Sequence, residues 1–122
     1  MANILIIDDN ESDCNTMKTL LEKEGHKISV AMNGKEAIKK VKSQKFDLIL
    51  LDIIMPKMSG YELLSLFREK MNHQLKIFYV SIIPKDEVDT FNVDGFIQKP
   101  FSPSSFLKSV EEGLKRGVKK GG

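Results

Sequence analysis

The sequence predicts an α/β domain built on a parallel sheet. Short apolar runs rich in leucine and β-branched residues alternate with segments whose apolar residues recur at helical spacing. The run at 46–51 is apolar at nearly every position, which is typical of a central strand covered on both faces. A chain of 122 residues can bury one such core and is too short for two. We therefore expect a single domain over residues 1–117, followed by a flexible tail at 118–122.

The first half of the chain alternates regularly between expected strands and helices. A strand at 3–7 precedes a helix that stops at Gly25, a residue type that often follows helix ends. A short strand spans 28–30, where apolar and polar residues alternate. The next helix begins at Asn33, and the central strand at 46–51 follows it. This order predicts parallel strands joined by right-handed crossovers.

The second half continues the same order. A loop at 55–60 leads into a helix, and the fourth strand spans 77–80. The fifth strand is expected at 96–97. Ser102 is an expected N-cap for the last helix, because proline follows it at the first helical position.

The segment between Ser81 and Phe96 has the weakest pattern. Pro84 interrupts it, and only Val88 and Phe91 mark an inward apolar face. A helix of such short length has little support of its own. We therefore expect the fourth helix to be shortened or irregular.

Composition excludes several classes of protein. Nineteen basic and seventeen acidic side chains leave a net charge of +2, too slight to indicate binding to nucleic acid or a membrane. No apolar run approaches the about 20 residues of a membrane span, and the start lacks the pattern of a signal peptide, so we expect a cytoplasmic protein. Cys14 is the single cysteine and is expected to be a small buried hydrophobe. His26 and His73 are isolated and are expected at the surface.

Charged side chains follow three of the expected strands. Asp8 and Asp9 come directly after the first strand, Asp52 after the central strand and Lys99 after the last. The carboxyl ends of parallel strands share one edge of the sheet, and ligands bind there. The sequence therefore predicts one compact polar site.

The residue types of this site suit a divalent cation and a phosphoryl group. Mg²⁺ prefers oxygen ligands and needs only one or two protein carboxylates. Clustered acids repel one another unless a cation lies between them, and Mg²⁺ and Lys99 would supply that charge. Asp52 is the candidate nucleophile, because it follows the central strand alone and a carboxylate can form an aspartyl-phosphate. Ser81, at the neighbouring strand end, can donate a hydrogen bond to a phosphoryl oxygen.

Four pieces of the chain together resemble a response-regulator receiver domain of the CheY-like kind. They are Asp8-Asp9, the stretch Leu51-Asp52-Ile53-Ile54-Met55-Pro56-Lys57-Met58-Ser59-Gly60, Ser81, and Phe96-Ile97-Gln98-Lys99-Pro100-Phe101. The likeness covers residues 3–116. It implies a flavodoxin-like three-layer sandwich whose five-stranded parallel sheet has the order 2-1-3-4-5.

The resemblance also implies roles for the acidic residues. Asp52 would accept a phosphoryl group from a phosphohistidine on a sensor histidine kinase or a histidine phosphotransfer protein. The Mg²⁺ ligands would be Asp9, Asp52 and the backbone carbonyl of Ile54, with Asp8 acting through water.

Two further roles follow from the resemblance. Ser81 and Lys99 would hold the phosphoryl oxygens. Phe96 stands where the family places a rotating aromatic that is coupled to the hydroxyl residue, here Ser81, and transmits the switch, although Phe96 can also be read as a core aromatic. The segment 81–99 is about one helical turn, roughly 3.6 residues, shorter than usual, which affects the output face more than the chemistry.

One bulky residue departs from the family's pattern, and a second apolar residue lies near it. Ile82 stands where the family usually has a small residue beside the phosphoryl group, and Ile54 adds a second apolar group near the same path. Both are expected to modulate access to the site. We predict that they shield the acyl phosphate from water and slow its hydrolysis.

The expected function is that of a stand-alone receiver, a signalling switch or phosphorelay intermediate rather than an enzyme that turns over a substrate. Its partners would be the phosphodonor protein and an unidentified downstream protein. We expect a monomer or a weak phosphorylation-dependent dimer.

Three other functions compete with this one. An aspartate-nucleophile phosphohydrolase needs a second acid two residues after the nucleophile, where this chain has Ile54. A flavin carrier of the flavodoxin type needs a hydroxyl- and glycine-rich phosphate loop after the first strand, where Asp8-Asp9 would repel phosphate. The third is a pseudo-receiver that docks partners without phosphorylation, and Ile82 with the short output segment keeps that alternative open.

Overall fold

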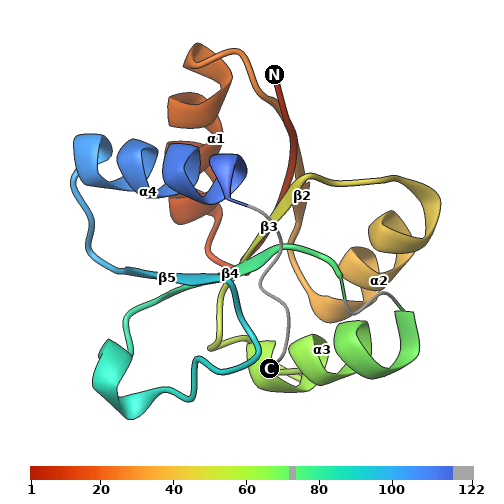
Figure 1. Ribbon diagram of the computed structural model, residues 1–122. Coiled ribbons are helices and arrows are strands. Elements are labelled where there is room, and N and C mark those ends of the chain that lie inside the picture. The colour runs from red at the N-terminus through yellow and green to blue at the C-terminus, as the bar shows by residue number, and fades with distance from the viewer. Residues whose placement is uncertain (72–73, 117–122) are drawn as a thin grey trace.

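A five-stranded parallel sheet lies at the centre of the computed structural model, which describes residues 1–71 and 74–116 (Figure 1). The strand order is β2-β1-β3-β4-β5, so the expected order 2-1-3-4-5 is confirmed. The strands are β1 (Asn3–Ile7), β2 (Lys27–Ala31), β3 (Leu48–Leu51), β4 (Ile77–Ser81) and β5 (Gly95–Gln98).

The central strand β3 begins two residues later than the sequence predicts, at Leu48 rather than Phe46. The Asp47 carboxylate accepts the Asn3 N–H at 2.8 Å. The Asp47 N–H in turn donates to the Asn3 carbonyl at 2.7 Å, so the start of β3 is tied to β1 by one side-chain and one backbone hydrogen bond.

Four α-helices cover the sheet in the described part of the chain: α1 (Glu11–Lys23), α2 (Gly34–Ser43), α3 (Gly60–Leu66) and α4 (Pro103–Lys115). Each follows a residue whose side-chain oxygen accepts a backbone N–H of the first turn, which satisfies a donor that the helix itself leaves free. These N-caps are Asn10, Asn33, Ser59 and Ser102. The predicted helix start at Asn33 and the predicted cap at Ser102 are thereby confirmed.

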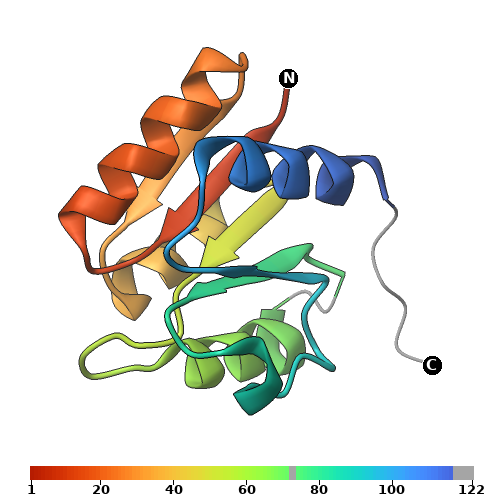
Figure 2. The same ribbon diagram turned by 90° about the vertical axis from the view of Figure 1, so that its left-hand side faces the viewer.

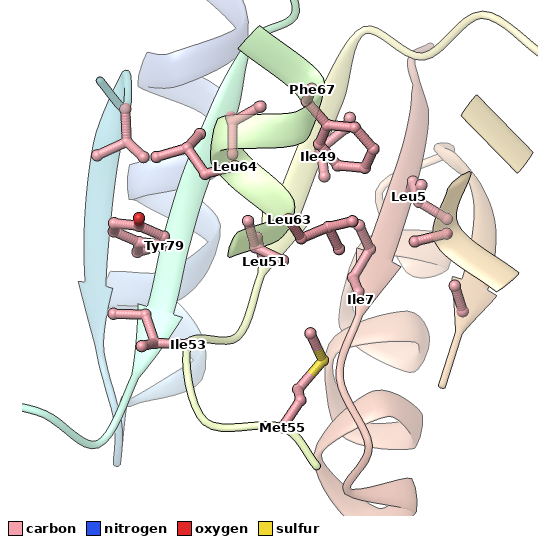
Figure 3. Close-up of a cluster of buried hydrophobic side chains, with 14 of the residues drawn as sticks. Leu5, Ile7, Ile49, Leu51, Ile53, Met55, Leu63, Leu64, Phe67 and Tyr79 are labelled. Atoms are coloured by element: carbon pink, nitrogen blue, oxygen red, sulfur yellow. The ribbon is translucent and has the colours of Figure 1, made fainter. Parts of the chain in front are cut away.

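The helices lie in two layers, with α1 and α4 on one face of the sheet and α2 and α3 on the other (Figures 1 and 2). Successive residues of β1 alternate between the two cores: Leu5 and Ile7 face α2 and α3, whereas Ile4 and Ile6 face α1 and α4. Figure 3 shows the first core. Its buried members include Ile49, Leu51, Ile53, Leu63, Leu64, Phe67 and Tyr79. The second core includes Cys14, Met17, Leu21, Leu48, Leu50, Phe78, Phe106 and Val110, which confirms the expectation for Cys14.

Two glycines make room for the ring of Phe78 on β4. A Cβ atom on Gly95 would lie 2.7 Å from this ring, and one on Gly113 would lie 2.3 Å from it. Both positions therefore exclude a side chain while the ring stays where it is. The guanidinium of Arg116 lies 5.9 Å from the ring centroid, within the range of a cation–π contact.

The connection between β4 and β5 contains only a 3₁₀ turn at Lys85–Glu87, which confirms the expected irregular fourth helix. Val88 is buried, as the sequence predicts. The expectation that Phe91 faces inward is wrong, because its side chain is 67% exposed. The Asp89 carboxylate accepts the Phe91 N–H at 2.9 Å and so fixes a local turn.

Arg68 joins three segments beneath this connection. It lies in a π-helical turn, Phe67–Met71, that continues α3. Its guanidinium donates to the carbonyl oxygens of Asn92 and Leu75 and to the carboxylate of Asp94 at 3.3 Å. Asp94 also accepts the N–H of Ile77, the first residue of β4, at 2.9 Å. Side-chain contacts thus hold the irregular connection in place.

His26 differs most clearly from the burial that the sequence predicts. The expectation that it is exposed is wrong, because its side chain is only 6% exposed. Nδ1 accepts the N–H of Ala2 at 3.1 Å, and Nε2 lies 2.9 Å from the Glu111 carboxylate. Partners far away along the chain cover the ring.

Two other expectations lie outside the described residues: the surface position of His73 and the flexible tail at 118–122. Among the residues that are described, no helix has the length and apolar character needed to cross a membrane.

Candidate functional site

Asp8 and Lys99 form the best-defined contact at the carboxyl edge of the sheet. Asp8 follows β1 and is 1% exposed, and its Oδ2 accepts a hydrogen bond from Lys99 Nζ at 2.7 Å. Its other oxygen accepts the N–H of Asn10 at 2.9 Å. Lys99 follows β5, and its N–H donates to the carbonyl of Ser81 at 2.8 Å. Strand pairing therefore brings two residues that are 91 positions apart into contact.

Asp52 lies beside this pair. Its backbone N–H donates to the carbonyl of Ile7, the last residue of β1, at 2.9 Å. The Asp52 side chain is 10% exposed, and its Oδ2 lies 3.9 Å from Lys99 Nζ. The predicted convergence of Asp8, Asp52 and Lys99 is thus present in the structure.

The surroundings of Asp52 favour its protonated form. Burial, followed by the negative charge of Asp8, raises the pKa of Asp52 to about 7 from an ordinary value of 3.8. The positive charge of Lys99 and a hydrogen bond from the Ile54 N–H act in the opposite direction. In the absence of a further cation, this carboxyl group is therefore only partly ionised near neutral pH.

Lys99 responds to the same cluster. Burial alone would lower the pKa of its ammonium, but the hydrogen bonds to Asp13 and Asp8 and the charge of Asp52 outweigh burial and raise it. Lys99 therefore stays charged.

Asp9 is exposed and completes a group of acids suited to a cation. One oxygen from each of Asp8, Asp9 and Asp52 lies within 4.8 Å of the others. All three donors are carboxylate oxygens, the kind that Mg²⁺ prefers, and the pKa of Asp52 is raised first by burial and then by the negative charge of Asp8. The residues present therefore fit a hard divalent cation.

Asp13 belongs to the cluster, although the sequence analysis did not identify it. Its Oδ2 accepts a hydrogen bond from Lys99 Nζ at 2.8 Å. Asn10 caps α1 by accepting the Asp13 N–H at 2.9 Å, and this places Asp13 in the first turn. An acid in the first turn after a strand that enters the site is a signal that could have identified it.

Ser81 ends β4 and is fully buried. Leu51 pairs with Tyr79 in the sheet, so Ser81 lies beyond the level of Asp52 along the neighbouring strand. Its Oγ accepts the Ile83 N–H at 3.2 Å, which leaves its own hydrogen to donate elsewhere. The Gln98 side-chain amide lies within 3.2 Å of the carbonyl oxygens of residues 81–83 and so fixes the loop after β4. Sequence reasoning gave no role to Gln98.

The remaining candidate residues differ in burial. Ile54 is 52% exposed and Ile82 is 64% exposed, so neither contributes to the core. Phe96 lies on β5, is partly buried and packs against the core beneath α2 and α3.

Comparisons with known proteins converge on one family. The response regulator receiver domain family matches residues 4–111. The chain is 38% identical over 118 residues to the transcriptional regulatory protein YvrH of Bacillus subtilis, covering 94% of this chain and 50% of that protein. It is 30% identical over 122 residues to the response regulator SaeR of Staphylococcus aureus, covering 95% of this chain and 52% of that protein. The chain thus spans about half the length of these curated relatives.

Solved structures agree with the sequence comparisons. The response regulator TrrA of Thermotoga maritima, solved in complex with Mg²⁺-BeF, superimposes with a TM-score of 0.84 at 31% identity. This match covers 93% of this chain and 99% of TrrA. The chain and TrrA therefore share the CheY-like fold.

Proposed function

Because the chain belongs to the response regulator receiver domain family, we propose that it is a signalling switch controlled by phosphorylation of Asp52. The observation that supports this most is the convergence of three carboxylates, Asp8, Asp9 and Asp52, beside the ammonium of Lys99. These groups would supply a phosphoryl acceptor, ligands for a cation and a positive partner for phosphoryl oxygens at one edge of the sheet.

The proposed step is a phosphoryl transfer to the Asp52 carboxylate. An Asp52 oxygen attacks phosphorus, and a new O–P bond forms as the bond from phosphorus to the donor nitrogen or oxygen breaks. The leaving group keeps the electron pair, and a leaving imidazole takes a proton from solvent. Lys99 and the Ser81 hydroxyl hold the oxygens of the transferred group.

Asp8, Asp9, Asp52 and the carbonyl of Ile54 are the proposed Mg²⁺ ligands, with Asp8 acting through water. The TrrA complex with Mg²⁺-BeF supports this assignment by family relationship. A bound Mg²⁺ would neutralise charge on the carboxylates and on the phosphoryl oxygens. Asp52 must ionise before it attacks, and a nearby cation lowers the pKa of a carboxyl group.

Response regulators are phosphorylated by histidine kinases. We infer that the donor here is a sensor histidine kinase or a histidine phosphotransfer protein, and that the phosphorylated form binds a downstream protein. Receiver domains are not a classical enzyme family. The chemistry proposed for this chain is limited to its own phosphorylation and dephosphorylation.

Ile54 and Ile82 are proposed to slow hydrolysis of the acyl phosphate by shielding it from water. Ile54 and Ile82 are 52% and 64% exposed, so their side chains are not fixed by packing in the core, and each lies close in sequence to Asp52 or Ser81. Ile82→Ala is expected to shorten the half-life of the phosphorylated protein. Equal half-lives in the two proteins would contradict the shielding role.

Intact-mass spectrometry after incubation with acetyl phosphate or phosphoramidate tests the proposed function. We expect the mass of one phosphoryl group to be added only when Mg²⁺ is present, and not at all in Asp52→Asn. Asp86→Asn is a matched control, because Asp86 is an exposed acid of the 3₁₀ turn and is not one of the clustered carboxylates.

Two results would contradict the proposal. Modification of Asp52→Asn at the wild-type level would place the acceptor elsewhere. A folded wild-type protein that gains no mass with either donor would favour a module that docks partners without phosphorylation.

A further inference from the structure

Lys99 is shared between two acids, and the two are held very differently. Asp8 is 1% exposed, and its second oxygen is bound by the Asn10 N–H. The Asp13 side chain is 40% exposed, and its contact with Lys99 is the one side-chain contact found for it in the described part of the chain. Asp13 is therefore the partner that Lys99 can release at lower cost.

We propose that Asp13 is a positioning residue that competes with the phosphoryl group for the Lys99 ammonium and thereby slows phosphorylation of Asp52. This inference rests on the proposed function. Asp13 need not contact the phosphodonor, because it acts through Lys99.

The geometry of the ammonium supports this competition. Lys99 Nζ lies 2.7 Å from Asp8 and 2.8 Å from Asp13, but 3.9 Å from Asp52, which is too long for a hydrogen bond. Two of its three N–H donors are thus directed to acids that do not accept the phosphoryl group. For Lys99 to bind the phosphoryl oxygens more strongly, its hydrogen bond to Asp13 must weaken.

Charge supports the same direction. Phosphodonors are anions, and Asp13 adds a fourth carboxylate to a site in which Lys99 is the one cation that contacts the acids in the described residues. Removing the Asp13 charge leaves more of the Lys99 charge available to the incoming anion. Partly exposed ion pairs change equilibria by about 2- to 5-fold, which sets the expected size of the effect.

Asp13→Asn is the variant that tests this inference. Asparagine keeps the shape of the side chain, and the backbone N–H that binds the Asn10 cap is unchanged. We expect phosphorylation by acetyl phosphate to become about 2- to 5-fold faster at low ionic strength, with a smaller gain at high salt. The decay of the phosphorylated form is expected to stay within about 2-fold of wild type, because Lys99 is bound to the phosphoryl group before and during hydrolysis.

Two matched variants separate the contact from general charge and from structural damage. Glu11→Gln removes an acid from the same first turn of α1, and Glu11 is exposed. It is expected to phosphorylate at the wild-type rate. Asp13→Glu keeps the charge and is expected to return the rate toward wild type. Structural damage would slow phosphorylation, so it cannot produce the expected acceleration.

The ¹H–¹⁵N NMR signal of the Lys99 ammonium gives a readout without phosphorylation. In the protein without added donor or cation, we expect this signal to shift in Asp13→Asn and to stay in place in Glu11→Gln. An unchanged signal in Asp13→Asn would overturn the inference by removing its structural basis.

The kinetic outcomes distinguish failure of this inference from failure of the proposed function. An unchanged or slower rate in Asp13→Asn, or an equal acceleration in Glu11→Gln, would overturn the role of Asp13 while wild-type phosphorylation still supports the switch. A wild-type protein that is not phosphorylated at all would overturn the proposed function and this inference with it.

Discussion

Two polar clusters lie at opposite ends of the strands. Acids outnumber the cation in one cluster, whereas the cation of the other is fully paired. At the carboxyl edge, Lys99 is the one cation among residues 1–71 and 74–116 that contacts the carboxylates of Asp8, Asp13 and Asp52. At the amino edge, Arg68 is bound by two backbone carbonyls and by Asp94. The first cluster carries unbalanced negative charge that a ligand can relieve, whereas the second is saturated by the protein itself. The difference distinguishes a cluster that is proposed to bind a ligand from a contact that holds the fold together.

The largest expected effect is the contribution of Asp52, in the unbalanced cluster, to the pH dependence of the free energy of unfolding. The pKa of Asp52 is about 7 in the folded protein against 3.8 ordinarily, so the folded state binds this proton more tightly than the unfolded chain. The resulting stabilisation is complete below pH 4 and is lost as pH rises through 7. Converted at 1.36 kcal/mol per unit, the shift corresponds to about 4 kcal/mol at most.

Chemical denaturation with a chelator present measures this effect. The free energy of unfolding is measured for wild type and for Asp52→Asn at each pH. The difference, wild type minus variant, should decrease as the pH is raised from 4 to 8. The subtraction removes the contribution of the other carboxyl groups. A difference that does not change with pH would contradict the raised pKa.

Breaking the saturated cluster should have the next largest effect. Arg68→Met leaves the Asp94 carboxylate and two carbonyl groups without this donor, and we expect a loss of about 3 kcal/mol in the free energy of unfolding. The rate of Asp52 phosphorylation should stay within about 2-fold of wild type at a temperature where both proteins are folded. Lys70→Met, an exposed neighbour in the same turn, is the matched control and should cost little.

A loss of phosphorylation in folded Arg68→Met would contradict the separation of the two clusters. A loss of stability in Lys70→Met equal to that in Arg68→Met would assign the effect to the turn rather than to the guanidinium.

The smallest expected effects are changes of opposite sign in the free energy of unfolding when one acid is neutralised in each cluster. Asp9→Asn removes one of several repelling acids and should stabilise the cation-free protein by about 0.5 kcal/mol at low salt. Asp94→Asn removes a paired charge and should destabilise it by about 1 kcal/mol. Thermal unfolding of both variants measures the two signs, and effects of the same sign would contradict the contrast.

The sequence was sufficient to predict the edge that carries the candidate site. Apolar runs defined the strands, and parallel pairing placed the residues after them together, so Asp8, Asp52 and Lys99 meet as predicted. Pro84 and the weak periodicity around it predicted the irregular connection that the structure contains.

What sequence reasoning missed depends on contacts between distant segments. The contact of Asp13 with Lys99 spans 86 positions, and His26 is covered by Ala2 and by Glu111, which is 85 positions away. Phe91 faces solvent because a local hydrogen bond turns the chain there. The order of residues does not show which distant segments meet, although the position of Asp13 in the first turn after β1 marks it as a candidate. The expected stand-alone organisation, the oligomeric state and the switch role of Phe96 stay predictions.

The separation of Asp8 from Lys99 by 91 positions has a consequence during protein synthesis. Lys99 follows β5, the last strand in chain order, and it reaches Asp8 only when β5 has paired with β4. A nascent chain that ends before this point already contains Asp8, Asp9 and Asp52 but has no cation to complete the cluster. The cluster is therefore complete only once β5 has joined the sheet, and under the proposed function we expect a chain that ends before β5 not to accept a phosphoryl group.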